Sequence, residues 1–184
     1  MSGIIGSLNT RGSGLVNLGS AADGTVFTGT GAGLPVGFEA AAGGGKVLQV
    51  QSATLETAVL SSATSFATIA GLSVDITPAA TSSEILVFIN VVGAFVLTGS
   101  VSWYSQIVRD STVIFNSGSI GSTVADFVQS NTGIHLDDTI STTSQVTYAF
   151  QAKGDSGATW SINRTRGGST VYGFSSITAI EIGA

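Results

Sequence analysis

The sequence predicts an all-β protein: a single antiparallel β-sandwich or jelly roll with an extended glycine-rich N-terminal arm. Two observations support this prediction. Just over half of the 25 glycines fall within residues 1–45, which carry few charged or bulky apolar side chains. From Lys46 onward, short runs of Val, Ile, Thr, Phe and Ser alternate with turn signals, and helical periodicity is nearly absent. We therefore expect residues 1–45 to form the arm and residues 46–184 to form the sandwich.

Within the arm, Asp23–Thr28 is typical of a turn that leads into a very short strand. Two bulky apolar residues lie side by side at the tip, between glycines that let the backbone approach a partner closely. We expect this tip to attach the chain to a larger assembly through Ser2, Gly3, Ile4, Ile5 and Gly6. A run of three glycines predicts a hinge before the sandwich, at Gly43, Gly44 and Gly45.

Four strands are expected first in the sandwich, at Lys46–Ala53, Phe66–Ala70, Leu72–Ile76 and Glu84–Leu97. Gly71 divides the second strand from the third. Pro78 ends the third strand, because proline cannot donate a hydrogen bond to a ladder. The run Ile85–Leu97 is apolar apart from Asn90 and Gly93. It is too short to span a bilayer, and its pattern is typical of a strand buried on both faces.

Six further strands are expected at Val101–Arg109, Thr112–Asn116, Gln145–Lys153, Ala158–Asn163, Thr170–Phe174 and Ser176–Ile182. Asp110 and Ser111 are the candidate two-residue link of a hairpin. Gly154–Gly157 and Arg166–Ser169 are the later turns. Ser122–Ser130 is ambiguous between helix and strand, and we do not expect a helix there. Alternation of apolar and polar residues predicts which side chains form the core. These are Ile85, Val87, Ile89, Val91, Val146, Tyr148, Phe150, Trp160 and Ile162.

Charge is scarce in this chain. Charged residues make up 9% of the sequence, against about 25% in typical soluble domains. A lone soluble protein usually carries more surface charge, so we expect part of the surface to be covered by other subunits. The net charge is −5 and the basic residues are scattered, which argues against nucleic-acid binding. The sequence contains no cysteine and no secretory or membrane-spanning segment is expected.

The residue types that carry catalysis do not form a recognisable constellation. His135 is the only histidine, and it precedes two carboxylates that could bind a hard cation, Asp137 and Asp138. An exposed polar loop is the simpler interpretation of this stretch, so we expect no metal and no cofactor. The glycine-rich segments also miss the spacing of nucleotide-binding loops, because Leu34 and Val47 occupy positions that those motifs require to be Gly and Ser or Thr.

Aromatic and basic residues raise the hypothesis of glycan binding. Trp103 and Tyr104 point to opposite faces of one expected strand, so at most one of them can line an external site. Trp160 shares a face with Ile162, which favours a core position. Receptor contact by Arg164 and Arg166 at a hairpin tip is a further hypothesis, against the alternative of an inert solvated turn.

The arm resembles parts of known phage proteins. Met1–Gly6 looks like the opening of many small virion proteins of marine tailed bacteriophages. Gly19–Phe38 resembles a segment of phage fibre proteins, although Ala22 and Thr25 replace the Thr and Gln usual there. The sandwich is similar to a module common at the C-terminal end of phage tail-fibre-like proteins, through Gly45–Val50, Gly71–Pro78, Ser82–Val87, Ile107–Asp110 and Ser176–Ile182.

The resemblance implies a homotrimeric virion appendage. The chain of 184 residues lacks the long shaft of a full-length fibre, so we expect a short, non-enzymatic, trimeric tail fibre or adhesin. Its arm would join a tail adaptor or hub, and its sandwich would meet a host surface polysaccharide. The alternative is a capsid decoration or head-fibre protein. A polysaccharide-degrading enzyme is a third hypothesis, for which Asp137 and Asp138 are the candidate carboxylates.

Overall fold

The computed structural model describes residues 25–29, 36–40, 46–96, 101–122, 127–155, 159–164, 171 and 173–183. The chain divides into two compact units, Met1–Gly43 and Gly44–Ala184. In the first unit, β1 (Thr25–Gly29) pairs antiparallel with β2 (Val36–Ala40). The strand expected near Asp23–Thr28 is therefore present, whereas the sequence does not predict β2. The expected attachment tip and glycine hinge lie outside the described residues.

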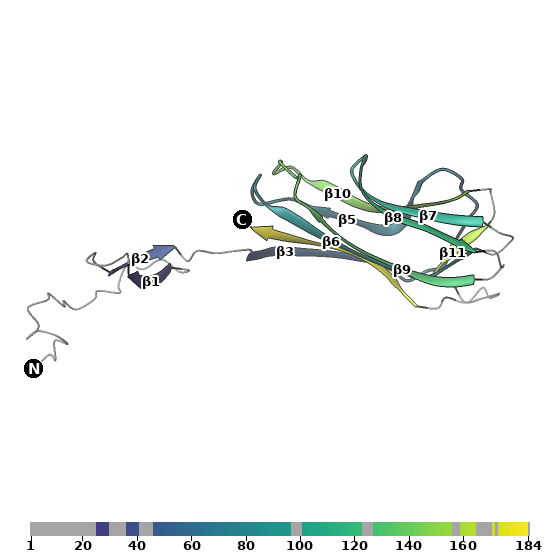
Figure 1. The fold of residues 1–184 in the computed structure, drawn as a ribbon, viewed down its shortest axis with the longest axis horizontal. Helices are drawn as coiled ribbons and strands as arrows, with labels where there is room; N and C mark the ends of the chain where they lie inside the picture. Colours follow the sequence, from purple (N-terminus) through teal and green to yellow (C-terminus); the bar gives the residue numbers. More distant parts are fainter. Residues whose placement is uncertain are drawn as a thin grey trace, which may run out of the picture. The chain divides into compact units, whose positions relative to one another are not determined.

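The second unit is a sandwich of two antiparallel sheets, drawn as two layers in Figure 1. The first sheet has the order β5-β10-β7-β8, with β5 (Ala67–Ile76), β10 (Val146–Gly154), β7 (Val101–Arg109) and β8 (Thr112–Ser122). The second has the order β3-β12-β6-β11-β4, with β3 (Lys46–Leu55), β12 (Ser175–Gly183), β6 (Glu84–Val96), β11 (Trp160–Ile162) and β4 (Val59–Ser61). β9 (Phe127–Asp137) pairs with β6 along the edge opposite β12.

The described residues contain no helix, and hence none that could cross a membrane. The predicted all-β, antiparallel fold class is confirmed. All the predicted core residues are buried between the sheets, and the most exposed of them, Val146, is only 5% exposed. Trp103 packs between Phe150 and Trp160, with ring centroids 6.0 and 6.4 Å away. The core position predicted for Trp160 is therefore confirmed.

The expectation that β6 is buried on both faces is wrong. Ile85, Val87 and Ile89 are at most 1% exposed, whereas Leu86 and Phe88, which alternate with them, are only half-buried. The inner face of β6 meets the first sheet. Its outer face points away from the core, and within the described part of the chain no third layer covers it.

The expected polar loop at His135–Asp138 is also wrong, because His135 and Asp137 belong to β9. β9 has an inverted pattern: its polar Asn131 and Asp137 are buried, while Ile134 and Leu136 are exposed. The Asp137 side chain points into the sandwich because Asp137 pairs with the buried Ile85, and cross-strand partners share a face. A search for apolar residues at core positions therefore misses this strand.

Smaller differences have local causes. The two strands expected around Gly71 are one continuous strand, β5, in which a register shift accommodates Gly71 at φ +89°. Positive φ suits glycine, so the residue bends the strand without ending it. The strand expected at Thr170–Phe174 is absent from its described residues, where Val171 makes only an isolated bridge to Arg164. The sequence does not predict β4.

A buried carboxylate on β12 joins three segments. Glu181 is 0% exposed. One oxygen, Oε1, accepts hydrogen bonds from the Ala79 amide and the Ser83 hydroxyl, and Oε2 accepts one from Gln49, all at 2.6 Å. Burial alone would raise the pKa of Glu181, but the bonds from Ser83, Gln49 and Ala79 outweigh it and lower the pKa. The ionised carboxylate thus holds the turn after β5 and strand β3 against β12.

Candidate functional site

A polar pocket of about 280 Å³ lies beside β8 and β9. β8 ends the first sheet and β9 lies at the edge of the second, so the pocket is at a side of the sandwich where the two layers meet. Its lining residues are Arg109, Thr112, Val113, Ile114, His135, Asp137, Asp138 and Thr139. This pocket contains both carboxylates that the sequence singles out, Asp137 and Asp138, and it is therefore the candidate functional site.

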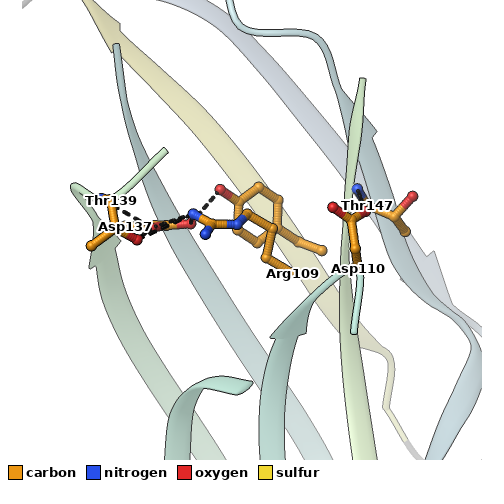
Figure 2. A network of polar contacts seen from close by, with 6 residues as sticks. Arg109, Asp110, Asp137, Thr139 and Thr147 are labelled. Atoms are coloured by element: carbon orange, nitrogen blue, oxygen red, sulfur yellow. Dashed lines mark hydrogen bonds and ion pairs between the residues drawn. The ribbon is translucent and has the colours of Figure 1, made fainter. Parts of the chain in front are cut away.

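Asp137 is the centre of the polar network drawn in Figure 2. Its side chain is 1% exposed. Arg109 Nη1 donates to Oδ1 at 2.8 Å and to Oδ2 at 2.6 Å. The Tyr148 hydroxyl donates to Oδ2 at 2.8 Å. The Thr139 hydroxyl donates to Oδ1 at 2.8 Å, and the Thr139 amide donates at 3.2 Å. Both carboxylate oxygens are therefore occupied by donors from the protein itself.

Two pKa shifts follow from this geometry. Burial of Asp137 acts to raise the pKa of its carboxyl, but hydrogen bonds from Thr139 and Tyr148 and the charge of Arg109 outweigh burial, so the pKa is lowered. Burial, then the hydrogen bond to Asp137 and its negative charge, raise the pKa of Tyr148. At neutral pH Asp137 is therefore an anion and Tyr148 a neutral donor.

The network links the two sheets. Arg109 on β7 and Tyr148 on β10 belong to the first sheet, and Asp137 on β9 belongs to the second. A tight turn fixes Arg109 at the end of β7: Asp110 adopts φ 53°. Asp110 also exchanges two bonds with Thr147, at 2.8 Å through the backbone and 2.9 Å through its carboxylate (Figure 2). The β7–β8 turn is thus pinned to β10, which holds Arg109 in place.

The described residues of the pocket offer few groups that are available for catalysis or for metal binding. Asp137 would have to lose bonds to Arg109, Thr139 or Tyr148 before it could bind a cation or accept a proton. Asp138 is exposed, and the His135 ring lies 5.6 Å from the Phe115 ring. In the described part of the chain, no group of three or more His, Cys, Asp or Glu side chains gathers as a metal site would require. The arrangement is suited to cross-linking two sheets.

Among the residues that the structure describes, the other candidates do not line this pocket. Trp103 is buried, and Tyr104 is half-buried with the Lys153 ammonium 5.2 Å from its ring centre, as the opposite-face prediction requires. Arg164 is half-buried beside its bridge to Val171, and Arg166 lies outside the described residues. Trp103 is therefore closed to an external ligand, and receptor contact by Arg164 and Arg166 stays a prediction.

The sequence does not predict the partnership of Asp137 with Arg109 and Tyr148. One signal points toward it: Tyr148 shares the apolar face of β10 with Val146 and Phe150, and a tyrosine at such a position needs a partner for its hydroxyl. The identity of the partner depends on which strand packs opposite β10, and local sequence does not contain that information.

No family model matches the chain, and no curated protein matches it. Among solved structures, it is similar to infectious bursal disease virus, Gt strain, with TM-score 0.42 and 11% identity over 84% of this chain and 44% of that one. The VP2 subviral particle of the same virus gives TM-score 0.38 and 10% identity, over 84% and 43% of the two chains. The Gx strain gives 0.40 and 12%, over 84% and 35%. This chain thus spans less than half the length of each of these proteins.

Proposed function

We propose that this chain is a non-enzymatic structural protein of a bacteriophage virion, a short homotrimeric tail fibre or adhesin anchored by its N-terminal arm. The observation that carries the proposal is the division of the chain into a small N-terminal unit and a large all-β unit, with the boundary inside a run of three glycines. A folded module on a glycine-rich leader fits an appendage, whose outer part works at a distance from its attachment point.

The chemistry of the polar pocket supports the non-enzymatic role. Asp137 is the most completely engaged group in that pocket, and its donors hold two sheets together. A general acid or base needs a pKa near the working pH, whereas the pKa of Asp137 is lowered. The low charged fraction of 9% further supports a protein whose surface is partly covered by other subunits in an assembly.

The tip of the arm is the proposed anchor, with Ile4 and Ile5 inserting into another virion protein and Gly43–Gly45 acting as the hinge. Deleting residues 2–7 should leave a folded trimer that no longer joins particles. The matched control is the double substitution Leu15→Ser, Val16→Ser, which removes a second apolar pair of the arm and should leave incorporation unchanged.

Three measurements test the proposal separately. Mass spectrometry of purified particles tests whether the chain is a virion component at all. Sedimentation at micromolar concentration tests the trimer, and a monomer with the arm intact would contradict that part. Labelled chain imaged on intact particles tests position: density at the tail supports the fibre, and density on the capsid surface assigns the chain to head decoration instead. Normal incorporation of the deletion variant would show that the anchor is elsewhere.

A further inference from the structure

The outer surface of the second sheet carries an apolar patch that crosses four strands. Cross-strand partners share a face, so the register defines its rows. One row runs Val50, Ile180, Leu86, Leu136 across β3, β12, β6 and β9. The next contains Phe88 beside Ile134, and the row on the other side pairs Val47 with Ile182. We call this set the outer apolar face, consisting of Val47, Val50, Leu86, Phe88, Ile134, Leu136, Ile180 and Ile182.

Much of this face is open to solvent in the single chain. Val47 is 63% exposed, Ile134 58%, Val50 54% and Leu136 41%. The four remaining side chains are half-buried. Scattered apolar residues on a surface are ordinary, but a contiguous patch that fills consecutive rows of a sheet marks an interaction site.

The inverted pattern of β9 adds an independent observation. This strand directs Asn131 and Asp137 into the sandwich, where they bond to Ser105, Arg109 and Tyr148. It directs Ile134 and Leu136 outward. Because Asn131 and Asp137 require inward partners, register places Ile134 and Leu136 on the outer side. A sheet that ends in water would carry polar residues there, so the apolar choice indicates that something covers this side.

We propose that the outer apolar face is the surface through which copies of this chain pack against one another. The proposal rests on the homo-oligomeric part of the proposed function and names its interface. The rows that contain Leu86, Phe88 and Asn90 hold only apolar residues, Ser, Thr and Asn, and the one carboxylate, Glu84, lies at the margin beside Ile182. Two negatively charged copies can therefore meet on these rows without like charges facing each other. A basic or acidic partner would gain nothing from such a face. In a trimer, the outer apolar faces of three copies would turn toward the threefold axis, where their side chains can interdigitate.

The size of the face also fits a second copy. At roughly 50 Å² of apolar surface for each half-exposed side chain, the eight residues present about 400 Å². A standard interface buries about 800 Å² on each partner, of which roughly half is apolar. The flanking Ser52, Asn90, Thr132 and Ser176 supply polar surface around it. Residues 1–45 are rich in glycine and poor in bulky apolar side chains, so they offer less area to this face than another sheet does.

The test replaces two exposed residues of the face, as Val50→Lys, Ile134→Lys. The matched control is Ala70→Lys, Ser73→Lys, which adds the same two charges at exposed positions of β5, a strand of the first sheet. In sedimentation and light scattering, the wild type and the control should associate equally. The double-lysine face variant should associate at least about tenfold more weakly, because association would bury unpaired charges. Unchanged circular dichroism and melting temperature show that the variants fold.

A second measurement does not depend on a disruptive variant. The chain contains no cysteine, so Ile134→Cys and Ser73→Cys each introduce a single thiol, the second on the exposed side of the first sheet. At concentrations where the protein associates, the thiol at position 134 should react more slowly with a soluble reagent than the thiol at position 73. The two rates should converge on dilution.

Each other outcome overturns the inference in a recognisable way. A wild type that stays monomeric would contradict self-association through this face, and so would a face variant that associates as strongly as the control. A protected thiol at position 134 in a monomer assigns the face to the chain's own arm. A monomer whose face variant alone fails to join particles assigns it to a different virion protein. Presence of the chain in purified particles is a separate result, so the virion role can stand when the inference falls, and the reverse.

Discussion

Replacing Tyr148 by phenylalanine isolates one bond of the cross-sheet network. The substitution removes the hydroxyl that donates to Asp137 Oδ2 at 2.8 Å and leaves the aromatic ring in place. Tyr148 is 0% exposed and Asp137 is 2% exposed, so water does not readily replace the lost donor. The packing of the core is otherwise preserved. The effect therefore reports on the hydrogen bond and on the carboxylate that loses it.

The bond joins a neutral hydroxyl to a buried anion. Hydrogen bonds to charged groups contribute about 1.5–3 kcal/mol to stability. Arg109 and Thr139 continue to satisfy Asp137 after the change, so we expect the loss to stay within that range. For a chain of this size, the melting temperature should fall by about 3–12 °C.

The pH dependence gives the reasoning a second, sharper check. The folded-state pKa of Asp137 is lowered, and Tyr148 is one of the causes. A depressed carboxyl pKa contributes stability above the unfolded value of 3.8, and this contribution is lost as pH falls toward the folded value. Without the Tyr148 hydroxyl, the folded pKa moves up toward 3.8. The difference in unfolding free energy between wild type and Tyr148→Phe should therefore be full at pH 7 and shrink below about pH 4.

Urea unfolding at a series of pH values measures both effects. Ser161→Ala is the matched control, because the buried Ser161 hydroxyl has no hydrogen-bond partner among the described residues and its removal should be neutral or stabilising. A loss below about 0.5 kcal/mol for Tyr148→Phe, which is within the range of inert surface changes, would refute the assigned role. A loss that is the same at pH 3 and pH 7 would refute the link to the ionisation of Asp137.

Two further predictions concern packing. Phe150→Ala should lower the free energy of unfolding by about 3–5 kcal/mol, because Phe150 is 0% exposed and packs against Trp103; urea unfolding checks this, and a change below about 1 kcal/mol would contradict the core assignment. Gly173→Ala should cost about 1–3 kcal/mol, because Gly173 has φ +84° and an added Cβ would lie 2.7 Å from Val92 Cγ1. In a Val92→Ala background, the Cβ added by Gly173→Ala no longer meets Val92 Cγ1, but the positive φ at position 173 remains. Gly173→Ala should therefore lower the melting temperature less in that background than in the wild type, as thermal unfolding can measure. No loss at all in the Val92→Ala background would show that backbone conformation contributes nothing.

Much of the sandwich follows from local sequence pattern. Val101–Arg109 has its predicted bounds, and β6, β10 and β12 lie within two residues of theirs. The bulky apolar residues of β10 alternate, which predicts the side chains that point inward, because successive residues of a strand face opposite sides. Tyr148 and Phe150 are therefore identifiable as core residues before any strand pairing is known. The scarcity of charge is likewise a property of composition alone.

Strand partners and the solvent exposure of individual residues depend on the tertiary structure. The triplet Asn163-Arg164-Thr165 reads in sequence as a glycosylation acceptor, yet Asn163 is 0% exposed. Its amide donates to Leu55 O at 2.6 Å, and its oxygen accepts from the Ser175 hydroxyl at 2.6 Å. Those partners are 108 and 12 residues away along the chain. Local spacing is the same whether an asparagine is buried or exposed, and only packing distinguishes the two.

The same reason explains why β9 and the outer apolar face are invisible in the sequence. Alternation states that Ile134 and Asn131 face opposite sides, but it does not state which side is the core. The side that faces the core is set by Asp137, because its buried carboxylate bonds to Arg109, 28 residues away, and to Tyr148. Local pattern sets the relative orientation of neighbouring side chains, while the direction of the whole strand is set by bonds between residues distant in sequence, which form only when the two sheets come together.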